Sequence, residues 1–261
     1  MNLNIKNKVF MVAGASSGLG LGIAHQLAAE GAKVSIASRT PDKIAQAASA
    51  ISSETSTEIR GYVFDARKQE SIHHWVQSTL NDFGHIDGVV INAGGPTPGS
   101  FDELDDKAWQ NAFDLTLMSA VRLIRETLPA LKVNGGSILT LTSSTIKEPV
   151  DYLTLSTVMR SGVAGLAKSL ADQLAEDNIR INNLIPCSIQ TDRMDALNQY
   201  IAGRSGTSRD QVRARIETDI PMGRYGSTEE FAKAATFLLS DAASYITGSS
   251  LAVDGGRMKS L

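Results

Sequence analysis

The sequence predicts an α/β sandwich of three layers, in which helices cover both faces of one parallel sheet of about seven strands. Three observations lead to this fold class. Short β-branched runs alternate with longer helical stretches along the chain, as in folds that return to one sheet through crossover helices. Several of the short runs are apolar throughout, as expected for strands buried on both faces. Glycines cluster directly after the first run, where doubly wound folds of the Rossmann type turn from strand to helix.

The strands are predicted where short length coincides with apolar, β-branched composition. In chain order they are Val9–Ala13, Val34–Ser38, Ile59–Phe64, Gly88–Ile91, Ser137–Leu141, Arg180–Ile185 and Ser250–Val253. The longer segments between them are predicted as helices: Gly18–Glu30, Asp42–Ser53, Gln69–Phe83, Asp105–Leu131, Leu153–Asp177 and Thr228–Ser240.

Residues at the helix ends support these assignments. Glu230 stands three residues after Ser227, which is the spacing of a capping box at a helix start. Gly31 and Gly84 follow predicted helices, where glycine commonly ends a helix. Asp105 is expected to cap the fourth helix.

Length and composition indicate one compact domain spanning residues 1–261. The stretch Ile189–Tyr225 has the weakest pattern, and we expect a small substrate lid near residues 190–225. A net charge of −3 gives no reason to expect nucleic acid or a membrane surface as a partner. The first ten residues lack the apolar core of a signal peptide, and a single cysteine allows no internal disulfide, so we expect a cytoplasmic protein.

The glycine cluster indicates a dinucleotide site. Gly14, Gly18 and Gly20 lie between the first strand and the first helix. Glycines there let the backbone turn tightly and approach a pyrophosphate, whose charge then lies on free helix N–H groups. Ser38 and Arg39 follow the second strand, where an NAD-binding protein usually presents a carboxylate. A hydroxyl and a guanidinium suit a 2′-phosphate instead, so NADP is preferred over NAD as the cofactor.

The glycine spacing, G-x-x-x-G-x-G, resembles that of the short-chain dehydrogenase/reductase family. Further matches are Asn92-Ala93-Gly94, the Pro186–Thr191 segment, Ile220–Arg224 and Asp254-Gly255-Gly256, so the resemblance covers essentially the whole chain. It is strongest to the β-ketoacyl-carrier-protein-reductase-like group. The resemblance implies an oxidoreductase acting on a small carbonyl or hydroxyl compound, and a homotetramer formed through the fourth and fifth helices.

The resemblance also implies the cofactor contacts, with Asp65 binding the adenine amino group. Together with the turn, it assigns them to Gly14, Ser16, Ser17, Gly18, Leu19, Gly20, Ser38, Arg39, Asp65, Ala66, Asn92, Ala93, Gly94, Arg160, Pro186, Ile189 and Thr191.

The catalytic set departs from the family pattern of Asn, Ser, Tyr and Lys. The tyrosine position holds Ser156 and the lysine position holds Arg160, while Ser143 matches the family's serine and Asp114 is expected at the asparagine position. An aliphatic hydroxyl is far less acidic than a phenol, and arginine cannot relay a proton. Tyr152, one helical turn before Ser156, is either a substitute proton donor or a packing residue in the preceding loop.

Three functions are compatible with this pattern. Hydride transfer can continue with Ser143 and Arg160 polarising the carbonyl while water or Tyr152 supplies the proton. The site can run a non-redox, lyase-type reaction. The chain can also be a cofactor-bound sensor or regulatory protein without turnover. Retention of the whole cofactor apparatus favours the first.

Three remaining features are interpreted more simply. The four histidines are scattered without ligand spacing, and we expect no metal site. Cys187 is interpreted as a buried, inert thiol. The loop Gly94–Gly99 follows the fourth strand and either borders the substrate pocket or serves as a rigid connector.

Overall fold

The computed structural model describes residues 1–260 and forms one seven-stranded sheet in the order β3-β2-β1-β4-β5-β6-β7. All neighbouring strands are parallel. The strands are β1 (Val9–Ala13), β2 (Lys33–Ser38), β3 (Ile59–Val63), β4 (Gly88–Ile91), β5 (Gly136–Leu141), β6 (Ile179–Pro186) and β7 (Ser250–Val253). The predicted fold class is confirmed, and the predicted strands differ from the observed ones by at most one residue at either end.

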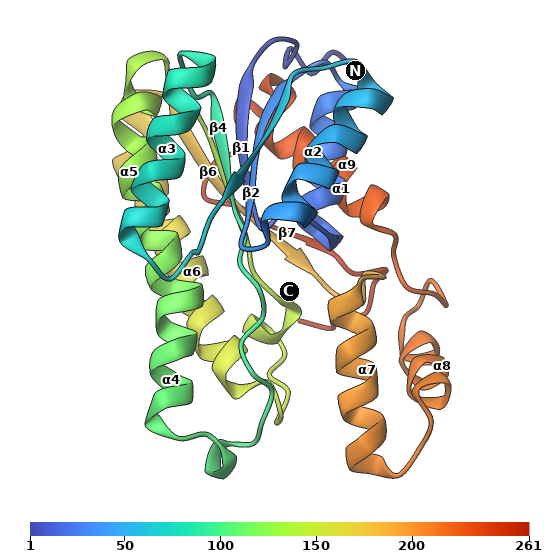
Figure 1. Ribbon diagram of the computed structural model, residues 1–261. Coiled ribbons are helices and arrows are strands. Elements are labelled where there is room, and N and C mark those ends of the chain that lie inside the picture. The colour runs from blue at the N-terminus through green and yellow to red at the C-terminus, as the bar shows by residue number, and fades with distance from the viewer. Residues whose placement is uncertain (261) are drawn as a thin grey trace.

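The helices lie in two layers, one on each face of the sheet (Figure 1). The first layer contains α1 (Gly18–Ala29), α2 (Pro41–Thr55) and α9 (Thr228–Leu239). The second contains α3 (Gln69–Phe83), α5 (Ser119–Asn134) and α6 (Thr154–Gln173). Each layer has its own hydrophobic core against the sheet, one around Ile23, Ile36 and Phe231 and the other around Trp75, Leu123 and Ile138.

The helix-end signals hold in the structure. Ser227 and Glu230 form the capping box at the start of α9. Asp105 accepts a hydrogen bond from the Ala108 amide. Gly84 ends α3 in the left-handed conformation, with φ of 84°.

One helix prediction was wrong, and two helices were not predicted. The single helix expected over Asp105–Leu131 divides into α4 (Asp106–Ala112), a π-helical segment (Phe113–Met118) and α5. The extra residue per turn in a π-helix changes which side chains face inward, and apolar periodicity alone does not reveal it. In the stretch 190–225, where the sequence pattern is weakest and no helix was predicted, the chain forms α7 (Asp192–Ser205) and α8 (Arg209–Asp219). Few apolar residues mark these helices, because each buries only a narrow strip.

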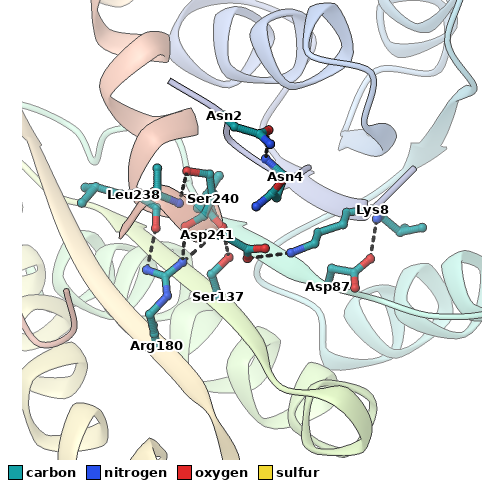
Figure 2. Close-up of polar contacts among 12 residues, drawn as sticks. Asn2, Asn4, Lys8, Asp87, Ser137, Arg180, Leu238, Ser240 and Asp241 are labelled. Carbon is teal, nitrogen blue, oxygen red and sulfur yellow. Dashed lines mark hydrogen bonds and ion pairs between the residues drawn. The ribbon is translucent and has the colours of Figure 1, made fainter. Parts of the chain in front are cut away.

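The amino ends of the strands are held by polar contacts to the end of α9 (Figure 2). The Arg180 guanidinium donates hydrogen bonds to the carbonyls of Leu238, at 2.8 Å, and Ser240, at 2.9 Å. The Ser137 hydroxyl donates to the Leu239 carbonyl at 2.8 Å. These donors satisfy carbonyls that have no partner within the helix, so they fix α9 to the sheet at this end.

Along residues 1–260, no helix combines the length and the apolar character that crossing a bilayer requires.

Candidate active-site cleft

A cleft of about 1300 Å³ opens at the carboxyl end of the sheet. Residues from the loops after β1, β4, β5 and β6 line it, among them Gly14, Asn92, Thr142 and Ser188. The helices α7 and α8 supply residues on its outer side. Ligands of open α/β folds bind at this edge of the sheet. Its volume exceeds the roughly 300–1000 Å³ of an ordinary small-molecule pocket, so it has room for two ligands together.

The glycine-rich turn forms one wall of the cleft. Gly14 and Gly18 have φ of +63° and +59°, a backbone region that glycine adopts without steric cost. A Cβ on Gly20 would lie 2.4 Å from the Gly14 carbonyl oxygen, so the third glycine lets the helix pack closely on the turn. The Asn92 side chain donates a hydrogen bond to the Ala13 carbonyl at 3.1 Å and thereby holds the turn against β4.

The first turn of α1 is available to an anion. Ser17 is the N-cap residue, but its side chain makes no capping hydrogen bond. Ser16, Ser17, Gly18 and Leu19 all line the cleft. Free N–H groups at a helix start carry positive partial charge, and they are the usual partners of a pyrophosphate.

Polar and basic groups lie at the end of β2. The Ser38 side chain is 7% exposed, and its hydroxyl has no hydrogen-bond partner in the described part of the chain. Arg39, Thr40 and Lys43 line the cleft beside it. An unpartnered buried hydroxyl next to two cations fits the 2′-phosphate of NADP. Lys43 was not predicted, although its position in the first turn of a helix after Arg39 could have indicated it.

Asp65 does not reach the cleft, although its neighbours Phe64 and Ala66 do. Both of its carboxylate oxygens accept hydrogen bonds from the Arg67 guanidinium, at 3.0 and 2.9 Å. The Arg67 hydrogen bonds hold the pKa of the Asp65 carboxyl below its ordinary value. The structure therefore brings Ala66, but not the Asp65 carboxylate, to the site.

Ser143, Tyr152, Ser156 and Arg160 all line the cleft. Arg160 is buried, and its Nη1 donates to the carbonyls of Leu141, at 2.9 Å, and Thr142, at 3.2 Å. Its Nη2 lies 3.5 Å from the Ala93 carbonyl. Arg160 thus connects the ends of β5 and β4 at the floor of the cleft. Burial, with a further contribution from the positive charge of Arg193, lowers the pKa of Arg160 to about 10, so the side chain is charged at neutral pH.

The hydroxyl groups near Arg160 have different surroundings. Ser143 Oγ accepts hydrogen bonds from Thr145, at 3.2 Å from its amide and 3.1 Å from its hydroxyl. Its own proton is therefore free to be donated elsewhere. Ser156 is buried in the first turn of α6.

Tyr152 lies in the loop before α6, which begins at Thr154. Its ring packs near that of Tyr200, with centroids 6.0 Å apart. Burial raises the pKa of its phenol. Of the two positions considered for Tyr152, the structure gives the loop, with the side chain at the cleft.

Asp114 does not take the fourth catalytic position, and that prediction is wrong. Its carboxylate accepts a hydrogen bond from Gln110 at 2.9 Å and lies 3.7 Å from Arg122, and it is not a lining residue of the cleft. The polar side chain of this π-helical segment that points inward is Thr116, whose hydroxyl is buried and without a partner in the described residues. A π-helical turn shifts the inward positions relative to an α-helix, which explains the error.

Two lining arginines were not predicted. Arg193, in the first turn of α7, donates to the Pro96 carbonyl at 3.0 Å. Arg257, after β7, donates to the Ser188 hydroxyl at 2.7 Å and lies 3.8 Å from the Cys187 sulfur. Gly94 and Gly95 also line the cleft, so the loop after β4 borders it. No sequence signal distinguishes these arginines from solvated ones, because their neighbours come from distant segments.

The helices α7 and α8 pack on each other through a small apolar cluster that includes Ala202, Val212, Ile216 and Tyr225. Within it, Tyr225 exchanges hydrogen bonds with Asn198, at 3.1 and 3.2 Å. Met194, Leu197 and Ile201 line the outer wall of the cleft.

Comparison with known proteins places this arrangement among reductases. The family model described as enoyl-(acyl carrier protein) reductase matches residues 14–257. The chain is 33% identical to the 3-oxoacyl-[acyl-carrier-protein] reductase of Escherichia coli K12 over 255 residues, covering 97% of this chain and 98% of the relative.

Solved structures of reductases have the same fold. L-sorbose reductase from Gluconobacter frateurii, in complex with NADPH and L-sorbose, is 31% identical with a TM-score of 0.94 and complete coverage of both chains. YwfH, an NADPH-dependent reductase involved in bacilysin biosynthesis, is 29% identical with a TM-score of 0.93, covering 98% of this chain and 100% of the other.

Proposed function

Because the chain belongs to the short-chain dehydrogenase/reductase family, we propose that it is an NADP-dependent oxidoreductase with an atypical active site. It would transfer a hydride to or from a small carbonyl or hydroxyl compound. The observation that carries this proposal is the presence of a glycine-rich turn, with an uncapped helix start, and a buried, charged Arg160 in the same cleft.

NADP is the cofactor that the polar groups support. Its pyrophosphate would lie on the first turn of α1, and its 2′-phosphate would lie between the Ser38 hydroxyl and the cations Arg39 and Lys43. Bound there, the nicotinamide supplies or accepts the hydride. Two structural relatives hold or use NADPH, which supports this choice.

Arg160 and Ser143 are the groups that would act on the substrate oxygen. A carbonyl oxygen becomes negative as hydride reaches its carbon, and a fixed, buried cation beside it stabilises that charge. Three carbonyl contacts use part of the five N–H donors of Arg160, so donors remain for the substrate. The Ser143 hydroxyl can donate beside it. Neither group gives up a proton readily, so the proton would come from water or from Tyr152.

The test separates cofactor binding from turnover. NADPH affinity is measured by calorimetry, and oxidation of NADPH is followed with a panel of aldehydes, ketones and oxo acids. The variants are Ser143→Ala and Arg160→Gln, with Arg160→Lys retaining the charge, and thermal melting checks that each variant folds. We expect NADPH binding in all folded variants, and a loss of turnover of at least about tenfold on removal of Ser143 or Arg160.

The other possible results of these assays point to other functions or other catalytic residues. NADPH binding without oxidation by any compound would replace this proposal with a cofactor-bound sensor. Turnover unaffected by both substitutions would show that other residues act on the substrate oxygen. Absence of NADPH binding would refute both functions.

We further propose that the chain assembles as a homotetramer and that α7 and α8 act as the substrate lid. The partly apolar surfaces of α5 and α6 support the first, since Val133 and Val158 are 75% and 47% exposed. The separate apolar cluster between α7 and α8 supports the second, because it lets the pair move as a unit. Light scattering during size-exclusion chromatography tests the assembly; a monomer would refute it.

A further inference from the structure

We propose that the substrate of this site carries a carboxylate, held by Arg193 and Arg257, so that the enzyme acts on an oxo acid or the corresponding hydroxy acid. This inference rests on the proposed function. It concerns the outer part of the cleft, between α7 and the chain after β7, which the cofactor-binding groups leave open.

The two arginines reach the cleft from different segments. Arg193 is set against the loop after β4, where a Cβ on Gly95 would lie 2.7 Å from its guanidinium. Arg257 is set against the segment after β6 by its hydrogen bond to Ser188. The positive charge of Arg257 acts on the phenol of Tyr152, and that of Arg193 acts on Arg160. Arg193 and Arg257 line the same cleft as Tyr152 and Arg160.

These cations lack partners of opposite charge. Within the described residues, the contacts of Arg160, Arg193 and Arg257 are backbone carbonyls, a hydroxyl and a thiol, and none forms an ion pair with a carboxylate. Of the acidic lining residues, Glu148 accepts hydrogen bonds from the Lys259 and Ser260 amides. Burial lowers the pKa of Arg160 and of Arg193, as expected for cations removed from water without compensation.

Two other acidic residues line the cleft, and neither forms an ion pair with Arg160, Arg193 or Arg257 in the described part of the chain. Asp192 and Asp219 line the cleft at the start of α7 and the end of α8. The start of α6 lies at the cleft without a capping side chain or an acidic residue in its first turn, so its free N–H groups add positive potential.

The cofactor does not account for the outer cations. Its phosphates are assigned to the α1 turn and to Ser38, Arg39 and Lys43, whereas Arg193 and Arg257 contact the segments after β4 and β6. A nicotinamide ring has no negative charge to offer Arg193 or Arg257. A carboxylate does, because its oxygens match the forked donors of a guanidinium. The apolar side chains Met194, Leu197 and Ile201 leave space beside them for a short hydrocarbon body.

The reaction balances with groups already named. In the reducing direction, the carbonyl carbon of the oxo acid gains the hydride, and its oxygen gains one proton from water or Tyr152. The carbonyl becomes a hydroxyl, NADPH becomes NADP⁺, and the carboxylate is unchanged.

The test compares 2-oxo and 3-oxo acids with their methyl esters, which remove the charge and keep the carbonyl. A charged hydrogen-bonding pair contributes enough to expect kcat/KM about 10- to 100-fold higher for the acid than for its ester. In Arg193→Gln and Arg257→Gln this acid-to-ester ratio should collapse toward unity. Arg209→Gln, at the start of α8 outside the cleft, is the matched control and should retain the ratio.

The possible failures are distinguishable. Equal kcat/KM for acids and esters in an active enzyme would overturn the carboxylate site alone, and so would a ratio unchanged in both variants. If no carbonyl compound is reduced, the proposed function fails, and the site is tested by calorimetry on the NADP-loaded protein. Tighter binding of the acid than of its ester, lost in Arg193→Gln, would support it, and equal binding would overturn it. A preference for oxo phosphonates over carboxylates would also overturn it.

Discussion

Replacing Arg39 by glutamine should weaken NADPH binding much more than NADH binding. Arg39 lies at the end of β2 next to the buried Ser38 hydroxyl, and it forms no ion pair with the described residues. NADPH and NADH differ only by the 2′-phosphate, so a loss confined to NADPH locates Arg39 at that group. The second cation, Lys43, remains and limits the loss.

The size of the effect follows from the contacts that are removed. A hydrogen bond to a charged group contributes about 1.5–3 kcal/mol, and Arg39 lies at the surface, where solvent screening places it near the lower end. A loss of about 1.5 kcal/mol corresponds to roughly a tenfold higher Kd for NADPH. Ser38→Ala removes one neutral donor and should cost about 1 kcal/mol, or roughly fivefold.

The assay is titration of the reduced cofactor, followed by its fluorescence, at low and at moderate ionic strength. Salt should narrow the difference between wild type and Arg39→Gln, because it screens an exposed cation from the phosphate. Arg60→Gln is the control, since Arg60 is an exposed cation on β3 that pairs with Glu58 away from the cleft. Equal losses for NADPH and NADH, or no loss for NADPH, would refute the assignment.

Three further predictions concern the pH profile, the glycine-rich turn and the scaffold. Because Arg160 loses its proton as pH rises through about 10, kcat/KM should be level through the neutral range and fall toward that pH; a fall within the neutral range would contradict this. Gly14→Ala should lower the free energy of unfolding by about 1–2 kcal/mol, since φ of +63° strains a side chain in the free and the bound protein alike, whereas Gly203→Ala, within α7, should not lower it. Arg180→Met removes donors to the end of α9 and should destabilise the fold by about 2–4 kcal/mol, roughly 4–16 °C in thermal melting, while an unchanged Tm would show that water replaces them.

The sheet was predictable because its strands are buried on both faces, so apolar composition marks each one. The glycine turn was predictable because Gly14, Gly18 and Gly20 serve a backbone requirement that other residues meet poorly. The helices α7 and α8 were not, since they bury only a few side chains against each other and against the cleft.

The residues of the candidate site that lie close together in the sequence could be predicted from their spacing. Those that come from distant segments could not. Ser143, Ser156 and Arg160 were selected by their spacing in the sequence, and all three line the cleft. Arg193 and Arg257 lie in segments far apart in the sequence, and only the fold brings them to one cleft. Asp114 was misplaced because a π-helical turn displaces the inward positions by part of a turn.

The contacts of Arg160 with carbonyls after β4 and β5 have a consequence for mutational paths between this site and the usual Tyr–Lys arrangement. Lysine at this position keeps one charge but has a single donor group, so Arg160→Lys alone gives up part of the bridge between the strands. Ser156→Tyr alone adds a phenol one helical turn before Arg160. The Arg160 guanidinium donates to backbone carbonyls, so it is not free to lower the pKa of that phenol. Each single substitution is therefore expected to lower activity more than the two substitutions together. The effects of the two substitutions are therefore not additive. A return to the Tyr–Lys arrangement one substitution at a time would pass through a less active variant.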